Sequence, residues 1–210
     1  MNFDDFKNNV SKLSATALGG LEAQFKLAPK FRQKYTQELI DAQNPKKAAV
    51  LALFYPNFQR ETSFLLTLRA AYKGIHASQI SFPGGKFDSS DESLENTALR
   101  EAHEEVGIQP YDVRIFKQMT DVFIPPSNFM VTPFLGLLDY TPTLTKNIEV
   151  EENILVLLED LLSDNAFSSA ILSTSYAKNM EVPCFMLNNH IVWGATAMML
   201  NEIKELLKET

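Results

Sequence analysis

The chain has 210 residues, of which 45% are apolar, and this is enough for one domain with a full hydrophobic core. The formal net charge of −7 argues against broad binding to nucleic acids or anionic membranes, although a bound metal ion would still admit one small anionic substrate. The chain has a single cysteine, Cys184, which excludes an intramolecular disulfide and disfavours a cysteine-based zinc site. Its apolar neighbours predict that Cys184 is buried in a strand.

The sequence shows no sign of a membrane segment. No apolar run approaches the length that spans a bilayer, and residues 1–10 lack the basic and apolar regions of a signal peptide. We therefore expect a cytoplasmic protein. The choice between a monomer and a homodimer stays open, because the amphipathic helices would serve either one.

Residues 1–44 are predicted to form a helical extension that packs on a main domain of residues 45–210. An amphipathic helix is expected over residues 2–17, and a second short helix over residues 34–42 ends before Pro45. A connector with glycine and proline joins the two. The apolar positions with helical spacing in the first helix are Phe3, Phe6, Val10 and Leu13.

The remaining chain mixes strands and helices without strict alternation, which indicates a layered α/β or α+β domain. A helix is expected over residues 91–105, capped by Ser90 or Asp91 and ended by Gly107. Strands are expected at 47–56, 62–70, 112–126, 128–140 and within 182–193, and further helices at 151–163 and 194–208.

The helix predicted over residues 91–105 concentrates acidic side chains on one side. At about 100° per residue, Glu104 and Glu105 lie about 60° and 40° to either side of Glu101, away from the apolar stripe. These like charges repel one another and lie near the unfavourable end of the helix dipole, with no lysine between Lys86 and Lys117. Because Mg²⁺ and Mn²⁺ prefer carboxylate oxygens, the pattern favours a divalent metal site, and a solvated helix face is the alternative.

The stretch FPGGKFDSSDESLENTALREAHEEVGI, residues 82–108, resembles the Nudix box of the Nudix hydrolases, G-x5-E-x7-R-E-U-x-E-E-x-G-U with U aliphatic. Glu92, seven residues and then the run from Arg100 to Ile108 match its second half, with Ala102 as the first U. Six residues separate Gly85 from Glu92 instead of five, and this insertion with the opening Phe-Pro-Gly-Gly resembles the coenzyme A diphosphatases. The resemblance implies a Nudix-type α/β/α sandwich with a mixed β-sheet.

An upstream segment extends the resemblance to the coenzyme A diphosphatases. Their motif resembles L-L-T-x-R-[SA]-x3-R-x3-G-x3-F-P-G-G, and residues 65–70, LLTLRA, match its start at the correct distance from Phe82. Gly74 stands where the second arginine is expected, and Ser78 where the glycine is expected. The resemblance implies that Arg69 contacts phosphate, assisted by Lys73 or His76 in place of the missing arginine.

The resemblance also implies roles for the residues of the box. Mg²⁺ or Mn²⁺ would be held by Glu101, Glu104, Glu105 and the carbonyl of Gly85, while Gly84 and Gly85 would also contact the substrate. Arg100 would organise a neighbouring carboxylate instead of clamping the substrate. Glu92 would stabilise the turn before the helix, through Arg100.

A general base is also needed. Glu101 is one candidate, and the segment NIEVEEN supplies Glu149 and Glu152 as others. His190 is interpreted as a turn residue, and the segment Trp193 to Thr196 as a packed strand-to-helix junction.

Three functions compete. The first is metal-dependent hydrolysis of coenzyme A or acyl-coenzyme A to 3′,5′-ADP and 4′-phosphopantetheine. The second is hydrolysis of another nucleoside diphosphate derivative, such as ADP-ribose or NADH, which Gly74 keeps open. The third is a module that senses a nucleotide without cleaving it, and the presence of Glu92, Glu101, Glu104 and Glu105 argues against it.

Overall fold

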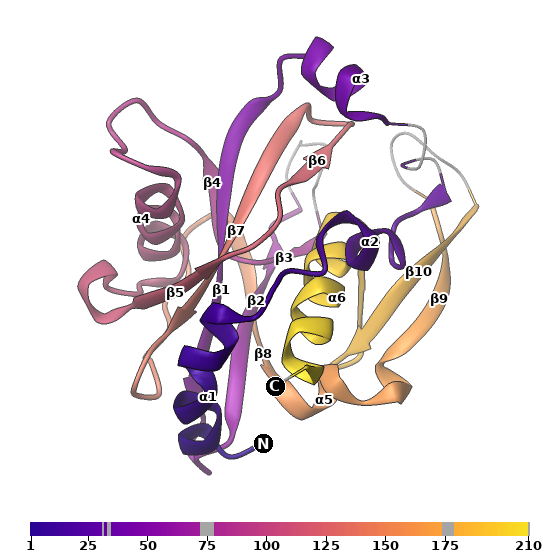
Figure 1. Ribbon diagram of the computed structural model, residues 1–210. Helices are drawn as coiled ribbons and strands as arrows, with labels where there is room; N and C mark the ends of the chain where they lie inside the picture. Colours follow the sequence, from indigo (N-terminus) through magenta and orange to yellow (C-terminus); the bar gives the residue numbers. More distant parts are fainter. Residues whose placement is uncertain (31, 33–34, 72–77, 174–178, 210) are drawn as a thin grey trace.

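The structure, a computed structural model, describes residues 1–30, 32, 35–71, 78–173 and 179–209. A large mixed β-sheet has helices on both faces, and a smaller sheet lies beyond one of these helices (Figure 1). The helices are α1 (Phe3–Ala15), α2 (Gly20–Phe25), α3 (Gln37–Ala42), α4 (Leu94–Val106), α5 (Leu158–Leu162) and α6 (Gly194–Lys208). The strands are β1 (Lys46–Pro56), β2 (Thr62–Arg69), β3 (Ile80–Ser81), β4 (Gly84–Lys86), β5 (Arg114–Gln118), β6 (Val122–Ile124), β7 (Phe129–Leu137), β8 (Val150–Leu157), β9 (Phe167–Leu172), β10 (Met180–Leu187) and β11 (His190–Trp193).

The large sheet is built around β1. Its main path runs β3-β2-β1-β7-β5, while β4 pairs with β1, β6 with β7, and β8 with β2. Strand β1 is parallel to β7, from Lys46 opposite Phe129 to Phe54 opposite Leu137, and antiparallel to β2 and β4. The predicted mixed sheet is therefore confirmed, and β1 places the strand of the glycine turn, β4, beside the centre of the sheet.

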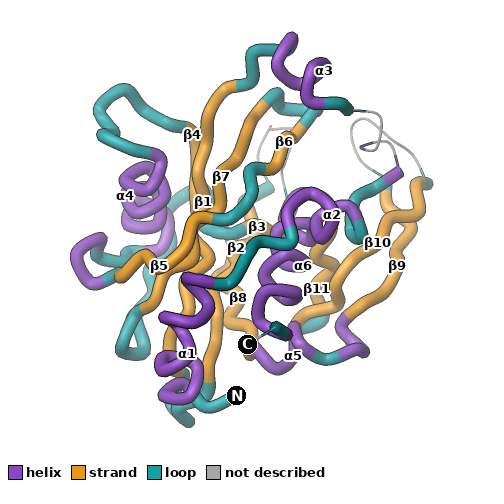
Figure 2. The backbone as a smooth tube through the Cα atoms, in the orientation of Figure 1, coloured by secondary structure: helices purple, strands orange, loops and turns teal. Residues whose placement is uncertain are grey.

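Alternate residues of β1 serve two hydrophobic cores. Leu51 and Leu53 face α4, where they pack with Ala98 and Ala102 in one apolar cluster. Alternate positions, such as Phe54, face the other cluster, which includes buried residues of α1 and α6. Figure 2 shows α4 and α6 on opposite sides of the large sheet, as an α/β/α sandwich requires.

The acidic helix α4 begins later than the sequence indicates. Its cap is Ser93, whose hydroxyl accepts a hydrogen bond from the backbone N–H of Asn96 at 3.1 Å. Asp91 instead turns its carboxylate toward the helix, where it accepts from Thr97 Oγ1 at 2.8 Å. At the other end Gly107 has a φ of 78° and closes the helix, as predicted.

The N-terminal segment packs against the sheet and α6. Helix α1 forms as predicted, and the Phe6 ring lies 5.0 Å from that of Phe54. Helix α2 falls in the segment that we expected to be an irregular connector. It is held by the buried carboxylate of Glu202, which accepts hydrogen bonds from the Gly20 N–H at 2.9 Å and the Gln24 side chain at 3.0 Å. The division of the chain at residue 44 stays a prediction.

Two predictions for the C-terminal third are wrong. Residues 150–157 form strand β8 instead of the start of a helix, because Val150, Ile154 and Val156 are buried with a two-residue period and the strand pairs with β2. The strand expected within residues 182–193 is present as β11, which ends at Trp193 and forms a hairpin with β10. His190 is therefore the first residue of a strand, paired with Leu187, and not a turn residue.

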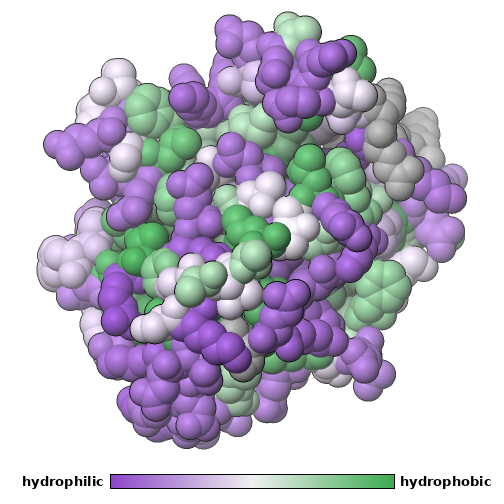
Figure 3. Space-filling view, viewed as in Figure 1, coloured by the Kyte–Doolittle hydropathy of each residue, from purple (hydrophilic) through white to green (hydrophobic). Residues whose placement is uncertain are grey.

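The surface agrees with the composition. Polar residues cover most of the face in Figure 3, with apolar side chains in scattered patches. Cys184 is buried in β10, as predicted. None of the described helices is long and apolar enough to cross a membrane.

Candidate active site

The glycine turn brings its backbone against both the sheet and the acidic helix. A Cβ atom on Gly84 would lie 2.4 Å from the carbonyl oxygen of Ala49, so only glycine allows β4 to approach β1 this closely. A Cβ on Gly85 would lie 2.5 Å from the carboxylate carbon of Glu101. The two glycines therefore set the position of Glu101 relative to the sheet.

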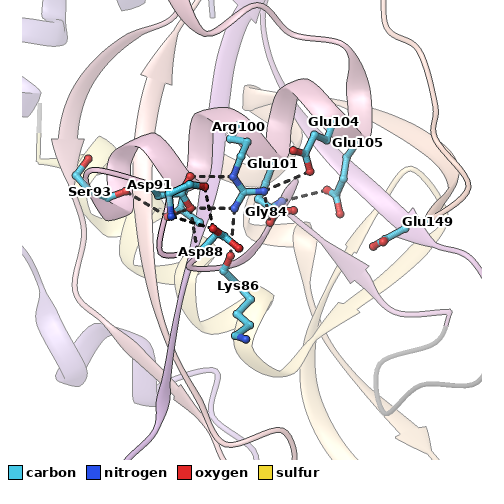
Figure 4. Close-up of polar contacts among 12 residues, drawn as sticks. Gly84, Lys86, Asp88, Asp91, Ser93, Arg100, Glu101, Glu104, Glu105 and Glu149 are labelled. Carbon is cyan, nitrogen blue, oxygen red and sulfur yellow. Dashed lines mark hydrogen bonds and ion pairs between the residues drawn. The ribbon is translucent and has the colours of Figure 1, made fainter.

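Arg100 is the centre of a hydrogen-bond network that joins α4 to the loop before it (Figure 4). Its guanidinium donates to both carboxylate oxygens of Asp91, at 2.8 and 2.9 Å, and to the carbonyl of Lys86 at 3.2 Å. It also donates to Glu101 at 2.9 Å and Glu104 at 3.3 Å. Arg100 thus orients neighbouring carboxylates, as the resemblance implies. Its two hydrogen bonds to Asp91 fix the loop before α4.

The acid that binds Arg100 is not the one that the sequence indicated. Glu92 is exposed, whereas the Asp91 side chain is only 5% exposed, and the pKa of its carboxyl is lowered chiefly by the hydrogen bonds from Arg100. Five residues separate Gly85 from Asp91, which is the spacing of the Nudix box. The extra residue of this chain therefore lies between that acid and Arg100, and the spacing counted forward from Gly85 indicates Asp91.

The three box glutamates differ strongly in burial. The exposed fractions of the Glu101, Glu104 and Glu105 side chains are 17%, 53% and 3%. The acidic face is therefore not separate from the packing face, because Glu105 is buried beside it. Burial raises the pKa of Glu101 and raises that of Glu105 to about 7, although the Gly84 N–H donates to Glu105 at 3.0 Å.

Arg69 and Glu149 lie beside the glutamates of α4. Arg69 ends β2 at a break in its register with β8, and it contacts Glu105 at 3.5 Å and Glu149 at 3.3 Å. Glu152 lies further along β8, opposite Leu68, with its carboxylate 3.7 Å from His190. Of the two acids considered as a general base in this segment, the structure brings Glu149 to the cluster and leaves Glu152 outside it.

A cleft with a volume of about 480 Å³ opens beside this cluster. At one end it is lined by Arg69, Gly85, Glu101 and Glu149, and its floor consists of apolar residues of β1 and β7. The start of α6 lines it as well, from Trp193 to Thr196, as does the buried Arg32. The junction that we interpreted as packing alone therefore forms part of a cleft wall, which the sequence pattern did not indicate.

The box supplies donors that fit a divalent cation. Glu105 is a buried and Glu101 a partly buried oxygen donor, and burial raises the pKa of both carboxyl groups, so a cation beside them would be favourable. Among the described residues, no group of three acidic, histidine or cysteine side chains is arranged to hold a metal ion. Arg100 orients Glu101, the Gly84 N–H orients Glu105, and Glu104 is the more exposed third donor. Lys73 and His76 lie outside the described residues.

Comparisons with known proteins agree with this architecture. Residues 45–173 match the family model of the NUDIX domain. The chain is 33% identical over 144 residues to NudL of Photorhabdus laumondii, described as an uncharacterised Nudix hydrolase, which covers 68% of this chain and 76% of that protein. NudL of Enterobacter sp. is 35% identical over 171 residues, covering 78% and 83%.

Solved structures show the same fold. A Nudix hydrolase of M. smegmatis, RenU, aligns with a TM-score of 0.55 and 21% identity, over 79% of this chain and 87% of that one. A MutT/nudix family protein of Enterococcus faecalis aligns with a TM-score of 0.52 and 15% identity, over 92% and 76%.

Proposed function

The chain belongs to the Nudix hydrolases, which hydrolyse phosphoric anhydride bonds and generally use divalent metal ions, and we propose that its substrate is coenzyme A or an acyl-coenzyme A. The reaction would cleave the diphosphate bridge and yield 3′,5′-ADP and 4′-phosphopantetheine or its acyl derivative. Mg²⁺ or Mn²⁺ would be the metal.

The observation that supports this proposal most is the position of the cleft. Glu101 of α4 lines one end of it beside Arg69 and Glu149, and an aromatic and a cationic residue, Trp193 and Arg32, line its wall as well. A diphosphate bridge held at the carboxylate end would allow one arm of the substrate to extend along the cleft. The Phe-Pro-Gly-Gly turn and the LLTLRA segment favour coenzyme A as that substrate.

The protein's own residues would supply the positioning. A divalent metal, when bound, would neutralise the diphosphate and lower the pKa of a bound water. Glu101, Glu104, Glu105 and the Gly85 carbonyl would hold it, and Arg100 keeps Glu101 and Glu104 oriented from the side of the loop. Arg69, at the mouth of the cleft, would contact a phosphate oxygen.

The chemical step needs one proton acceptor. Water adds to one phosphorus, the bond from that phosphorus to the bridging oxygen breaks, and the water's proton goes to a carboxylate. Glu101 and Glu149 are the two candidates, because both line the cleft. Because Glu101 would also hold the metal, Glu149 is the carboxylate to which we assign the proton.

The test is hydrolysis of a small panel, namely coenzyme A, an acyl-coenzyme A, ADP-ribose and NADH, with Mg²⁺ or Mn²⁺. Chromatography of the products, beside a Glu104→Gln control, would show metal-dependent release of 3′,5′-ADP. Release of AMP from ADP-ribose or NADH alone would reject coenzyme A and retain the family's chemistry. Binding without turnover of any of them would reject catalysis.

A further inference from the structure

We propose that Trp193 and Arg32 form a pocket for the 3′-phosphoadenosine end of the substrate, in which Arg32 reads the 3′-phosphate. This inference rests on the proposed function, because it names which arm of coenzyme A lies along the cleft. It assigns substrate selection to two residues outside the Nudix box.

Trp193 has the surroundings of a stacking residue. It is the last residue of β11, is partly exposed, and lines the same cleft as Glu101. Gly194, the next residue, lines the cleft as well, and a Cβ atom built on it would meet no side chain of the described residues within 4 Å other than those of its chain neighbours. An indole that borders a cleft suits a flat base, since every nucleic-acid base can stack on an aromatic ring.

Arg32 is a cation fixed on the same wall. The residue is 7% exposed, and its guanidinium donates to the Phe123 carbonyl at 2.7 Å and lies 3.5 Å from the Met198 sulfur. Met198 belongs to α6, the helix that begins directly after Trp193, so its contact with the guanidinium connects Arg32 to the same element as Trp193. Arg32 and Trp193 both line the cleft, where a phosphate and a base of one nucleotide would meet them.

The wall is attached to the catalytic turn. The buried Thr196 hydroxyl donates to the carbonyl of Ile80 at 2.9 Å, and Ile80 begins β3, directly before the Phe-Pro-Gly-Gly turn. On its other side Trp193 pairs with Cys184 in the smaller sheet. A base stacked on Trp193 would therefore be held at a fixed distance from Gly85 and Glu101, which is what a selective site requires.

Kinetics with coenzyme A and dephospho-coenzyme A, which lacks only the 3′-phosphate, test the role of Arg32. The wild-type protein should prefer coenzyme A in kcat/KM by about tenfold or more, as expected for one charged contact. Arg32→Ala and Arg32→Lys should lower kcat/KM for coenzyme A about tenfold more than for dephospho-coenzyme A. Lys30→Ala is the matched control, because Lys30 is an exposed cation two residues away that does not line the cleft.

Fluorescence tests the pocket without any turnover, because Trp193 is the only tryptophan of the chain. In metal-free wild-type protein, 3′,5′-ADP should change the emission and bind about tenfold more tightly than AMP, whereas pantetheine should change nothing. Equal affinity for the two nucleotides, or a response to pantetheine alone, would overturn the inference even if the Arg32 variants fail to fold.

The two proposals fail in different ways. Hydrolysis of coenzyme A without any preference over dephospho-coenzyme A would refute the pocket and keep the proposed function. Selective binding of 3′,5′-ADP at Trp193, without hydrolysis of coenzyme A, would support the pocket and reject the proposed function.

Discussion

Replacing Gly85 by alanine tests whether the glycine turn positions the carboxylate of Glu101 for the proposed reaction. The added Cβ would lie 2.5 Å from the Glu101 carboxylate carbon and from Oε2, and 2.7 Å from Oε1. Ordinary contacts between such atoms begin near 3.5 Å, so the carboxylate must move by about 1 Å. A displacement of this size in a positioned group costs about 100-fold in rate, and we expect kcat to fall by that factor.

The assay is steady-state hydrolysis of coenzyme A with Mg²⁺, together with thermal unfolding of each variant. Gly19→Ala is the matched control, because its Cβ would lie 2.7 Å from the Cβ of Ala23, far along the chain from the box. That variant should lose stability and keep its kcat. The double variant Gly85→Ala/Glu101→Gln should be no slower than Glu101→Gln alone, since both changes act on one carboxylate. A kcat of Gly85→Ala within threefold of the wild type would refute the reasoning.

Three further predictions concern the acids around the site. Asp91→Asn should lower the free energy of unfolding by about 2–3 kcal/mol, because it breaks the bidentate pair with Arg100. Denaturant titrations measure this change. The control is Glu92→Gln, which removes the charge of the exposed neighbour and should have no effect. Glu149→Gln should lower kcat about tenfold and Glu152→Gln should leave it unchanged; the reverse order would make Glu152 the base. Burial raises the pKa of Glu105 from 4.5 to about 7, so the folded metal-free protein binds that proton more tightly than the unfolded chain does. The resulting stability, about 3 kcal/mol, is present below pH 4.5 and is lost as the pH rises toward 7. The free energies of unfolding of the wild type and of Glu105→Gln, measured in chelator, should therefore differ by an amount that follows this pH dependence. A difference that does not change with pH would contradict it.

The acidic helix could be predicted because its signals are local. The helical spacing of the glutamates, the closing Gly107 and the position of Gly85 all lie within one short stretch of sequence. Box spacing counted backward from Arg100 indicates Glu92 as its partner, whereas spacing counted forward from Gly85 indicates Asp91. The choice between Glu92 and Asp91 depends on how the loop folds back on the helix, and the side chain of Thr97 helps to decide it.

The parts that could not be predicted depend on contacts between distant segments. Residues 150–157 contain enough leucine and glutamate to suggest a helix, but pairing with β2 makes them a strand. That strand turns Glu152 toward His190 and leaves Glu149 at the cluster, so the helix expected over residues 151–163 could not distinguish the two acids. The position of Trp193 in the cleft wall depends likewise on the contact between the start of α6 and β3, which no local sequence pattern predicts.

The cleft wall also has a consequence for how such proteins diverge. The match to the family domain ends at residue 173, yet the segment from Trp193 to Thr196 lines the cleft and Arg32 precedes the match altogether. The glutamates of the box and these wall residues are thus encoded in separate stretches of the gene. Mutation can change the wall while the box stays intact, so two relatives with identical boxes can differ in the nucleotide they consume.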